Sequence, residues 1–137
     1  MNELVLSLFP GIGILDKGFE EAGFCIVRGP DLIWGGDIRK FHPPVDVFHG
    51  VIGGPPCQEF SSDGNRKHLL RKTTSRSWAE LRRSLELQGL PGDYFGDLPY
   101  RVEAAHSLIG NAVALPMARE LARAVRQALA ADTAEEA

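Results

Sequence analysis

The feature that most constrains the fold is a change of hydrophobic period near the N-terminus. Residues 4–9 form a short apolar run that ends at the turn 10–13, after which the period becomes helical and Gly23 provides a stop. Residues 24–27 are again apolar and β-branched, as in a second strand. The apolar face of the intervening helix holds Leu15, Phe19 and Ala22, and its polar positions are Asp16, Lys17, Glu20 and Glu21. This order predicts a βαβ unit and a parallel sheet.

The turn between the first strand and the helix has the form Gly-x-Gly, at Gly11 and Gly13. A helix that begins after such a turn offers free N–H groups to an anion. A tight turn with nothing bound is an equally good interpretation of the two glycines alone.

A cysteine follows a third apolar segment. Residues 47–52 predict a strand, Gly53 and Gly54 end it, and two prolines fix the backbone before Cys57. This arrangement holds the thiol at the mouth of a strand, where a nucleophile could act, although a small buried hydrophobe in a turn is the alternative. We expect Cys57 and Cys25, the only cysteines, to be reduced.

Composition restricts the possible partners. The 137 residues predict a single domain, and 44% hydrophobic content can supply a core. Fifteen basic and eighteen acidic residues give a net charge of −3, so any contact with DNA must be local. The absence of a leader pattern and of a long apolar segment predicts a soluble, cytoplasmic protein without membrane contacts. The four histidines lack the spacing of metal ligands, so no metal site is expected.

Residues 61–83 are strongly basic and have little periodicity before residue 75. A loop that grips phosphates and a solvated loop explain such a segment equally well. The candidate DNA contacts are Ser61, Arg66, Lys67 and Arg71. From Ser77 onward, Leu81, Leu85 and Leu87 predict a helix that ends near residues 88–91.

Four segments together resemble the DNA cytosine-5 methyltransferases. Residues 53–61, Gly-Gly-Pro-Pro-Cys-Gln-Glu-Phe-Ser, match the Pro-Pro-Cys-Gln signature of that family, whose cysteine attacks C6 of the target base. Residues 8–13 are similar to its S-adenosylmethionine loop, although Ile14 stands where members commonly have another glycine. Residues 85–91 and 106–116 are similar to its penultimate and last motifs.

The resemblance implies S-adenosylmethionine as the cofactor and assigns roles to individual residues. It places Phe9 on the adenine, Asp31 on the ribose hydroxyls, Asp37 on the adenine amine and Asn111 over the bound cofactor. Both aspartates also suit a purely turn-forming role, and Trp34 either stacks on the cofactor or lies in the core. The full implied set is Phe9, Gly11, Ile12, Gly13, Asp31, Asp37, Ile38, Pro56, Asn111 and Ala112.

The chain also departs from the family between the cysteine motif and the penultimate motif. The resemblance covers residues 4–61 and 79–130. The sequence between them lacks the family's Glu-Asn-Val triplet, its Gln-x-Arg-x-Arg motif and its target-recognition region. A general acid such as that glutamate typically contributes about 10²- to 10⁴-fold in rate. Three functions are therefore open: a cytosine-5 methyltransferase, compact or completed by a partner chain; a module that binds S-adenosylmethionine or DNA without chemistry; or a shortened fragment.

The implied fold is an α/β, Rossmann-like S-adenosylmethionine-dependent methyltransferase domain over residues 1–137, from a bacterial or phage-like source. We expect a truncated sheet of four parallel strands with flanking helices. The strand before Cys57 becomes an exposed edge, which favours self-association or a partner chain. Residues 132–137 form an acidic tail that should fray. The last helix should bury Leu115, Ala118, Ala122, Val125 and Leu129 and expose Arg119, Arg123 and Arg126.

Overall fold

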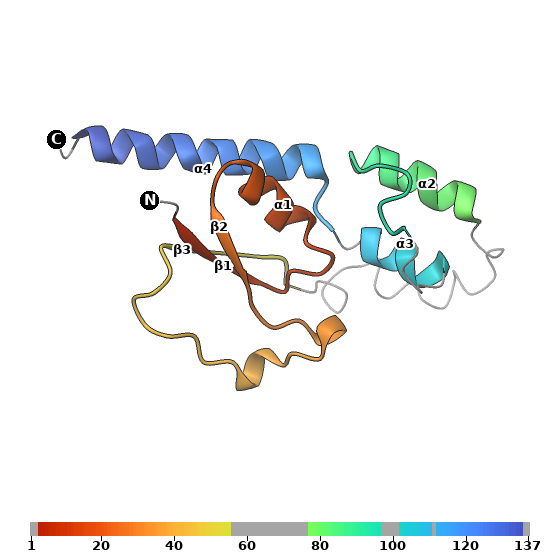
Figure 1. Cartoon of the computed structure of the whole chain (residues 1–137), viewed down its shortest axis with the longest axis horizontal. Coiled ribbons are helices and arrows are strands. Elements are labelled where there is room, and N and C mark those ends of the chain that lie inside the picture. The colour runs from red at the N-terminus through yellow and green to blue at the C-terminus, as the bar shows by residue number, and fades with distance from the viewer. Residues whose placement is uncertain (1–2, 56–76, 97–101, 111, 136–137) are drawn as a thin grey trace, which may run out of the picture. The chain divides into compact units, whose positions relative to one another are not determined.

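A computed structural model describes residues 3–55, 77–96, 102–110 and 112–135. The chain divides into two compact units, one formed by residues 1–54 and 112–137 and the other by residues 55–111. The elements of the first unit are β1 (Leu4–Leu8), α1 (Ile14–Glu21), β2 (Cys25–Arg28), β3 (Gly50–Gly53) and α4 (Leu115–Glu135), and those of the second are α2 (Trp78–Leu87) and α3 (Val102–Gly110) (Figure 1).

The sheet of the first unit is parallel and has the order β2-β1-β3. Leu6 of β1 lies opposite Val27 of β2 and Val51 of β3, so these three side chains share one face. The βαβ unit expected from the N-terminal sequence is present, and the architecture is α/β. Within this sheet β3 is an edge strand, as expected for the strand that precedes Cys57.

The expectation of four strands is wrong for the described residues, which form three. The connection between β2 and β3 contains no further strand but two short 3₁₀ helices, η1 (Leu32–Trp34) and η2 (Ile38–Lys40). Asp31 caps η1 by accepting a hydrogen bond from the Ile33 N–H, and Gly35 ends it with φ of 82°. This local capping satisfies backbone groups that a strand would have offered to a neighbour.

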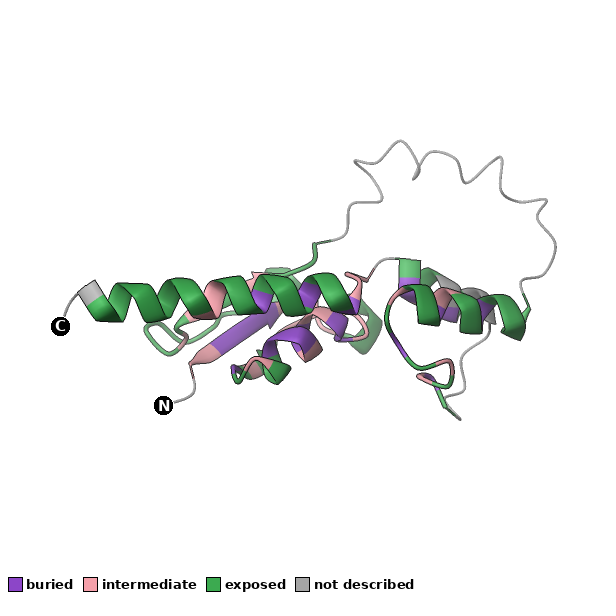
Figure 2. Cartoon of the chain, turned by 90° about the horizontal axis from the view of Figure 1, so that it is seen from above, coloured by how far each residue is buried: buried purple, intermediate pink, exposed green. Residues whose placement is uncertain are grey.

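Helices α1 and α4 cover one face of the sheet. Val5, Phe19, Phe24 and Ala122 form the buried core there, and Figure 2 shows most of β1 as buried while α4 is exposed along most of its length. A Cβ on Gly18 would lie 2.6 Å from the Cβ of Ala118, so the absence of a side chain at residue 18 allows the two helices to approach.

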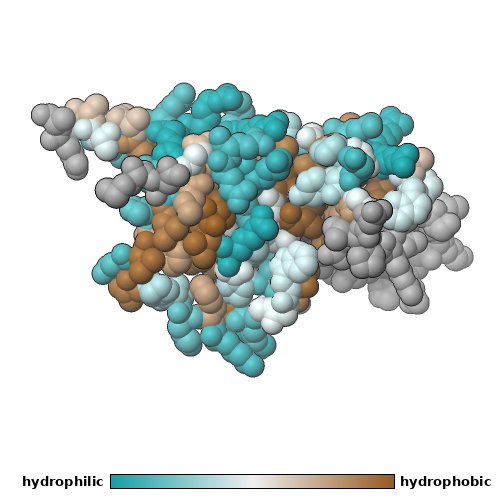
Figure 3. All heavy atoms as spheres, in the orientation of Figure 1, coloured by the Kyte–Doolittle hydropathy of each residue, from teal (hydrophilic) through white to brown (hydrophobic). Residues whose placement is uncertain are grey.

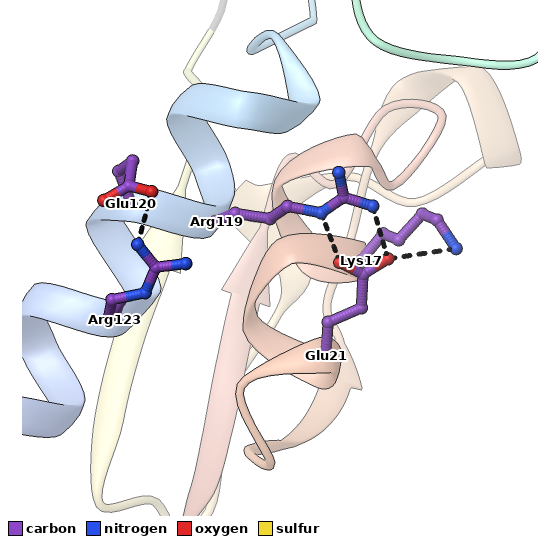
Figure 4. Close-up of polar contacts among 5 residues, drawn as sticks. All are labelled: Lys17, Glu21, Arg119, Glu120 and Arg123. Carbon is purple, nitrogen blue, oxygen red and sulfur yellow. Dashed lines mark hydrogen bonds and ion pairs between the residues drawn. The ribbon is translucent and has the colours of Figure 1, made fainter.

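Ion pairs join α1 and α4 at the rim of this core. The Arg119 guanidinium donates to both carboxylate oxygens of Glu21, at 2.5 and 3.2 Å, and Lys17 lies 3.5 Å from the same carboxylate (Figure 4). These donors, Arg119 first, hold the pKa of Glu21 below its ordinary value. Arg126, expected on the exposed face, pairs with Glu3 and lies 4.0 Å from the centre of the Phe24 ring. Its guanidinium therefore contributes to packing as well as to charge.

Within the first unit, neither α1 nor α4 packs on the opposite face of the sheet. Val27 and Val51 are exposed on this face, and Val45 and Val47 are exposed in the connection to β3. Hydrophobic side chains gather over the strands and the adjoining loop in Figure 3. An α/β sheet normally buries both faces, whereas the described residues of the first unit leave these valines exposed.

In the second unit, α2 begins at the Ser77 cap, where Ser77 and Glu80 form a reciprocal capping box. Leu81 and Leu85 are buried as expected, whereas Leu87 is 78% exposed and was wrongly placed on the apolar face. Gln88 caps the helix, and Gly89 follows with φ of 77°. The predicted helix and its end are thus confirmed.

The last helix extends further than expected. Leu115, Ala118 and Ala122 are buried, but Leu129 is 39% exposed and does not belong to the buried stripe. Residues 132–135 continue α4 instead of fraying. None of the helices in the described ranges has the length and hydropathy needed to span a membrane.

Candidate functional site

The glycine turn, residues 9–13, connects the carboxyl end of β1 to the start of α1. Gly11 and Gly13 have φ of 56° and 77°, and Phe9 has φ of 54°, a conformation that non-glycine residues rarely adopt. The Phe9 N–H donates to the Pro30 carbonyl at 3.3 Å, which ties the turn to the segment after β2. Such a backbone conformation often marks a functional turn.

Two side chains after β2 hold the glycine turn. The Gly11 N–H donates to Asp31 Oδ2 at 2.9 Å, and Asp31 Oδ1 accepts from the Ile33 N–H at 3.0 Å. The Trp34 indole N–H donates to the Gly11 carbonyl at 2.9 Å, although Trp34 is 62% exposed. Trp34 is therefore not a core residue, and its ring is accessible beside the turn.

Asp37 is engaged locally. It caps η2 by accepting from the Arg39 N–H at 3.0 Å, and both of its oxygens accept from the Arg39 guanidinium at 2.7–3.1 Å. The Arg39 side chain, and then its backbone N–H, hold the pKa of Asp37 below its ordinary value. Because Arg39 is 83% exposed, this pair faces water, and a ligand amine could compete for the carboxylate.

Sequence reasoning missed the best-buried polar cluster of the unit. Asp16, expected on the polar face of α1, is 0% exposed; its Oδ1 accepts from the Ser7 hydroxyl at 2.5 Å and its Oδ2 from Arg28 Nε at 2.8 Å. Ser7 itself is 1% exposed. A serine within an apolar strand is the one sequence signal for this cluster, because a buried hydroxyl requires a partner.

The remaining candidate residues divide into described and undescribed positions. Ile12 and Ala112 are half-buried, and Ile38 is 36% exposed at the start of η2. The other candidates lie outside the described residues: Pro56, Cys57, Ser61, Arg66, Lys67, Arg71 and Asn111. Their roles stay predictions from the sequence.

The described residues fit the cofactor that the methyltransferase resemblance implies. A Cβ on Gly11 would meet nothing within 4 Å, so the turn leaves open space at that position. The N-cap of α1, Gly13, has no side chain to cap the first helical N–H groups. Asp31 and Asp37 supply carboxylate acceptors at the neighbouring strand end and turn. This donor and acceptor set suits a ligand with hydroxyl, amine and carboxylate groups.

Two other features of the described surface carry no assigned role. A shallow hollow of about 310 Å³ lies between α1 and α4, away from the glycine turn, and its arginines are paired with carboxylates. Within the described ranges, no three histidine, cysteine, aspartate or glutamate side chains gather as a metal site.

Comparison with known proteins identifies relatives of part of the chain. It is 41% identical over 78 residues to Type II methyltransferase M.NgoPII of Neisseria gonorrhoeae, a match to 44% of this chain and 23% of that protein. It is 39% identical over 81 residues to M.FnuDI of Fusobacterium nucleatum, covering 47% of this chain and 24% of the relative. It is 37% identical over 82 residues to M.HgiGI of Herpetosiphon aurantiacus, covering 44% of this chain and 64% of that relative.

The chain is therefore similar to type II methyltransferases, which confirms the methyltransferase resemblance. It spans about a quarter of the length of the first two relatives. No family model and no solved structure matches the chain.

Proposed function

We propose that this chain is the cofactor-binding and nucleophile-bearing part of a DNA cytosine-5 methyltransferase with a Rossmann-like domain. The similarity to type II methyltransferases carries the proposal. The glycine turn supports it independently, because its backbone conformation and open space suit a ligand at the end of a parallel strand.

S-adenosylmethionine, when bound, supplies an electrophilic methyl group. In this proposal Phe9 contacts the adenine, Asp31 accepts from the ribose hydroxyls and Asp37 accepts from the adenine amine. The two hydrogen bonds that Asp31 already accepts leave further lone pairs on its oxygens. Asp37 must share or lose its pairing with Arg39 in order to accept the amine.

Cys57 is proposed as the nucleophile. Its thiolate forms a bond to C6 of cytosine, which moves ring electron density to C5, the atom that is methylated. Transfer of the C5 proton to a water molecule would then let the sulfur–C6 bond break and restore the thiolate. Because the sequence contains no Glu-Asn pair, we propose that a partner chain supplies the missing acid and the recognition region.

Calorimetry with S-adenosylmethionine tests the cofactor site, and transfer of labelled methyl groups to DNA tests the reaction. Digestion of the product DNA and mass spectrometry of its nucleosides identify the methylated atom, so 5-methylcytosine is the expected product. Cys57→Ala should abolish all transfer while cofactor binding persists. Activity that survives this substitution, or methylation of an exocyclic amine instead, contradicts the proposed mechanism.

A second candidate is a module that binds the cofactor or DNA without chemistry. The missing acid and the limited coverage of the relatives favour it. The two candidates differ in one measurement, because only the enzyme should transfer methyl groups when a chain containing the Glu-Asn-Val motif and a recognition region is added.

A further inference from the structure

The side chain of Arg28 lies across the glycine turn. Its Nη2 and Cζ would be 2.6 and 3.1 Å from a Cβ placed on Gly13, the N-cap of α1. A Cβ at residue 13 would require the guanidinium to move, and the φ of 77° at Gly13 independently favours glycine. The turn and Arg28 therefore form one local structure.

The buried carboxylate of Asp16 accepts a hydrogen bond from Arg28 and holds its side chain in place. Its Nε donates to Asp16 Oδ2 at 2.8 Å, and the other oxygen of this fully buried carboxylate accepts from Ser7 at 2.5 Å. The three residues come from β2, α1 and β1, which converge at the turn (Figure 1). Because a carboxylate removed from water requires strong donors, Asp16 restricts the position of Arg28.

The terminal nitrogen Nη2 of Arg28 lies close to Gly13, whereas the bond to Asp16 uses Nε. Asp16 is the only described carboxylate in an ion pair with Arg28, and the contact uses Nε, while the side chain stays 57% exposed. A guanidinium held by one edge can still present its Nη donors to a second planar anion. These donors lie beside the uncapped first turn of α1, which also favours negative charge.

We infer that Arg28 binds the carboxylate of the methionine portion of S-adenosylmethionine, with Asp16 and Ser7 as its positioning residues. This inference rests on the proposed function. The carboxylate is the one anionic group of that cofactor, and among the described residues Arg28 is a cation that lies beside Gly13 of the turn. The adenosine portion then lies on the side of the turn held by Asp31 and Trp34, whose hydrogen-bonding groups and exposed ring suit a nucleoside.

The test compares two ligands that differ in a single group, S-adenosylmethionine and its decarboxylated form. Binding of both to the wild-type chain and to Arg28→Met is measured by calorimetry, with folding checked by circular dichroism. Hydrogen bonds to charged groups predict that Arg28→Met weakens S-adenosylmethionine binding about 10- to 100-fold. Affinity for the decarboxylated ligand should change less than about twofold, since it makes no contact that the substitution removes.

Two further variants separate ligand contact from structural support. Arg28→Met leaves Asp16 buried without its cation, so the double variant Arg28→Met/Asp16→Asn restores charge balance if the single variant unfolds. It should show the same selective loss. Arg119→Met is the matched control, because Arg119 is a similarly exposed arginine that pairs with a carboxylate at the other end of α1. It should bind both ligands as the wild-type chain does.

The outcomes distinguish this inference from the proposed function. If the wild-type chain binds neither ligand at millimolar concentration, the proposed cofactor site is wrong and this inference with it. If the wild-type chain binds S-adenosylmethionine, two results overturn the role of Arg28 alone: equal affinity of the wild-type chain for both ligands, or equal losses for both ligands in the folded Arg28 variant.

Discussion

Replacing Gly18 by alanine tests whether the approach of α1 and α4 organises the first unit. A Cβ at this position would lie 2.6 Å from the Ala118 Cβ and 2.7 and 2.9 Å from the backbone carbon and oxygen of Ala118. Non-bonded carbon atoms prefer about 3.5–4.0 Å, so the overlap is about 1 Å. Two of the three atoms belong to the backbone and cannot rotate away. The helices must therefore separate, which loosens the packing of Phe19 and Ala122.

Two opposing effects set the magnitude. Overpacking a well-filled core costs about 1–3 kcal/mol, whereas replacing glycine by alanine inside a helix contributes up to about 1 kcal/mol of stability. We expect overpacking to dominate, with a net loss of about 1–2 kcal/mol in the free energy of unfolding. For a chain of this length, that loss corresponds to a decrease in Tm of roughly 3–10 °C.

Urea unfolding followed by circular dichroism at 222 nm measures this loss. Gly110→Ala is the control, because Gly110 also lies in a helix but a Cβ there meets nothing within 4 Å. It should leave stability unchanged or raise it slightly. Ala118→Gly should rescue Gly18→Ala only in part, since it removes one of the three close contacts. A Gly18→Ala chain as stable as the wild type would refute the reasoning.

Three further predictions concern pH, cofactor selectivity and assembly. Arg119 lowers the pKa of Glu21, and a backbone hydrogen bond followed by Arg126 lowers the pKa of Glu3, both below the ordinary 4.5. The folded state therefore binds fewer protons than the unfolded state, so this stabilisation should be complete above pH 4.5 and decline as pH falls through the lowered values. Glu21→Gln should reduce that decline in urea titrations at several pH values. If Asp37 accepts the adenine amine, Asp37→Asn should weaken S-adenosylmethionine binding about 10-fold in calorimetry. Arg39→Ala should not weaken it, and equal losses of affinity in the two variants would assign the Asp37–Arg39 pair a structural role. The edge strand Gly50–Gly53 should promote association that increases with concentration in light scattering, and a strictly monomeric chain across a dilution series contradicts this expectation.

The candidate site was predictable where one side chain carries its own signal. Asp31 and Trp34 were singled out from the sequence, and both contact the glycine turn in the structure. The sequence did not determine which partners they take, because a carboxylate accepts equally well from a ribose hydroxyl or from a backbone N–H. Nothing in the sequence singles out Arg28, because only the fold brings the end of β2 close to Gly13.

Local sequence patterns suffice to predict several strands and helices of this protein. The change of period after residue 9 and the stop at Gly23 predicted β1, α1 and β2, and the leucine spacing after Ser77 predicted α2. These elements depend on residues close to one another in the sequence, so their periodicity can be recognised without the tertiary structure. Tertiary structure alone decided that Asp16 is buried, that residues 32–34 form a 3₁₀ helix and not a strand, and that α4 approaches α1 at Gly18. Each of those outcomes depends on groups distant in the chain or on competition between local capping and strand pairing, and only packing settles that competition.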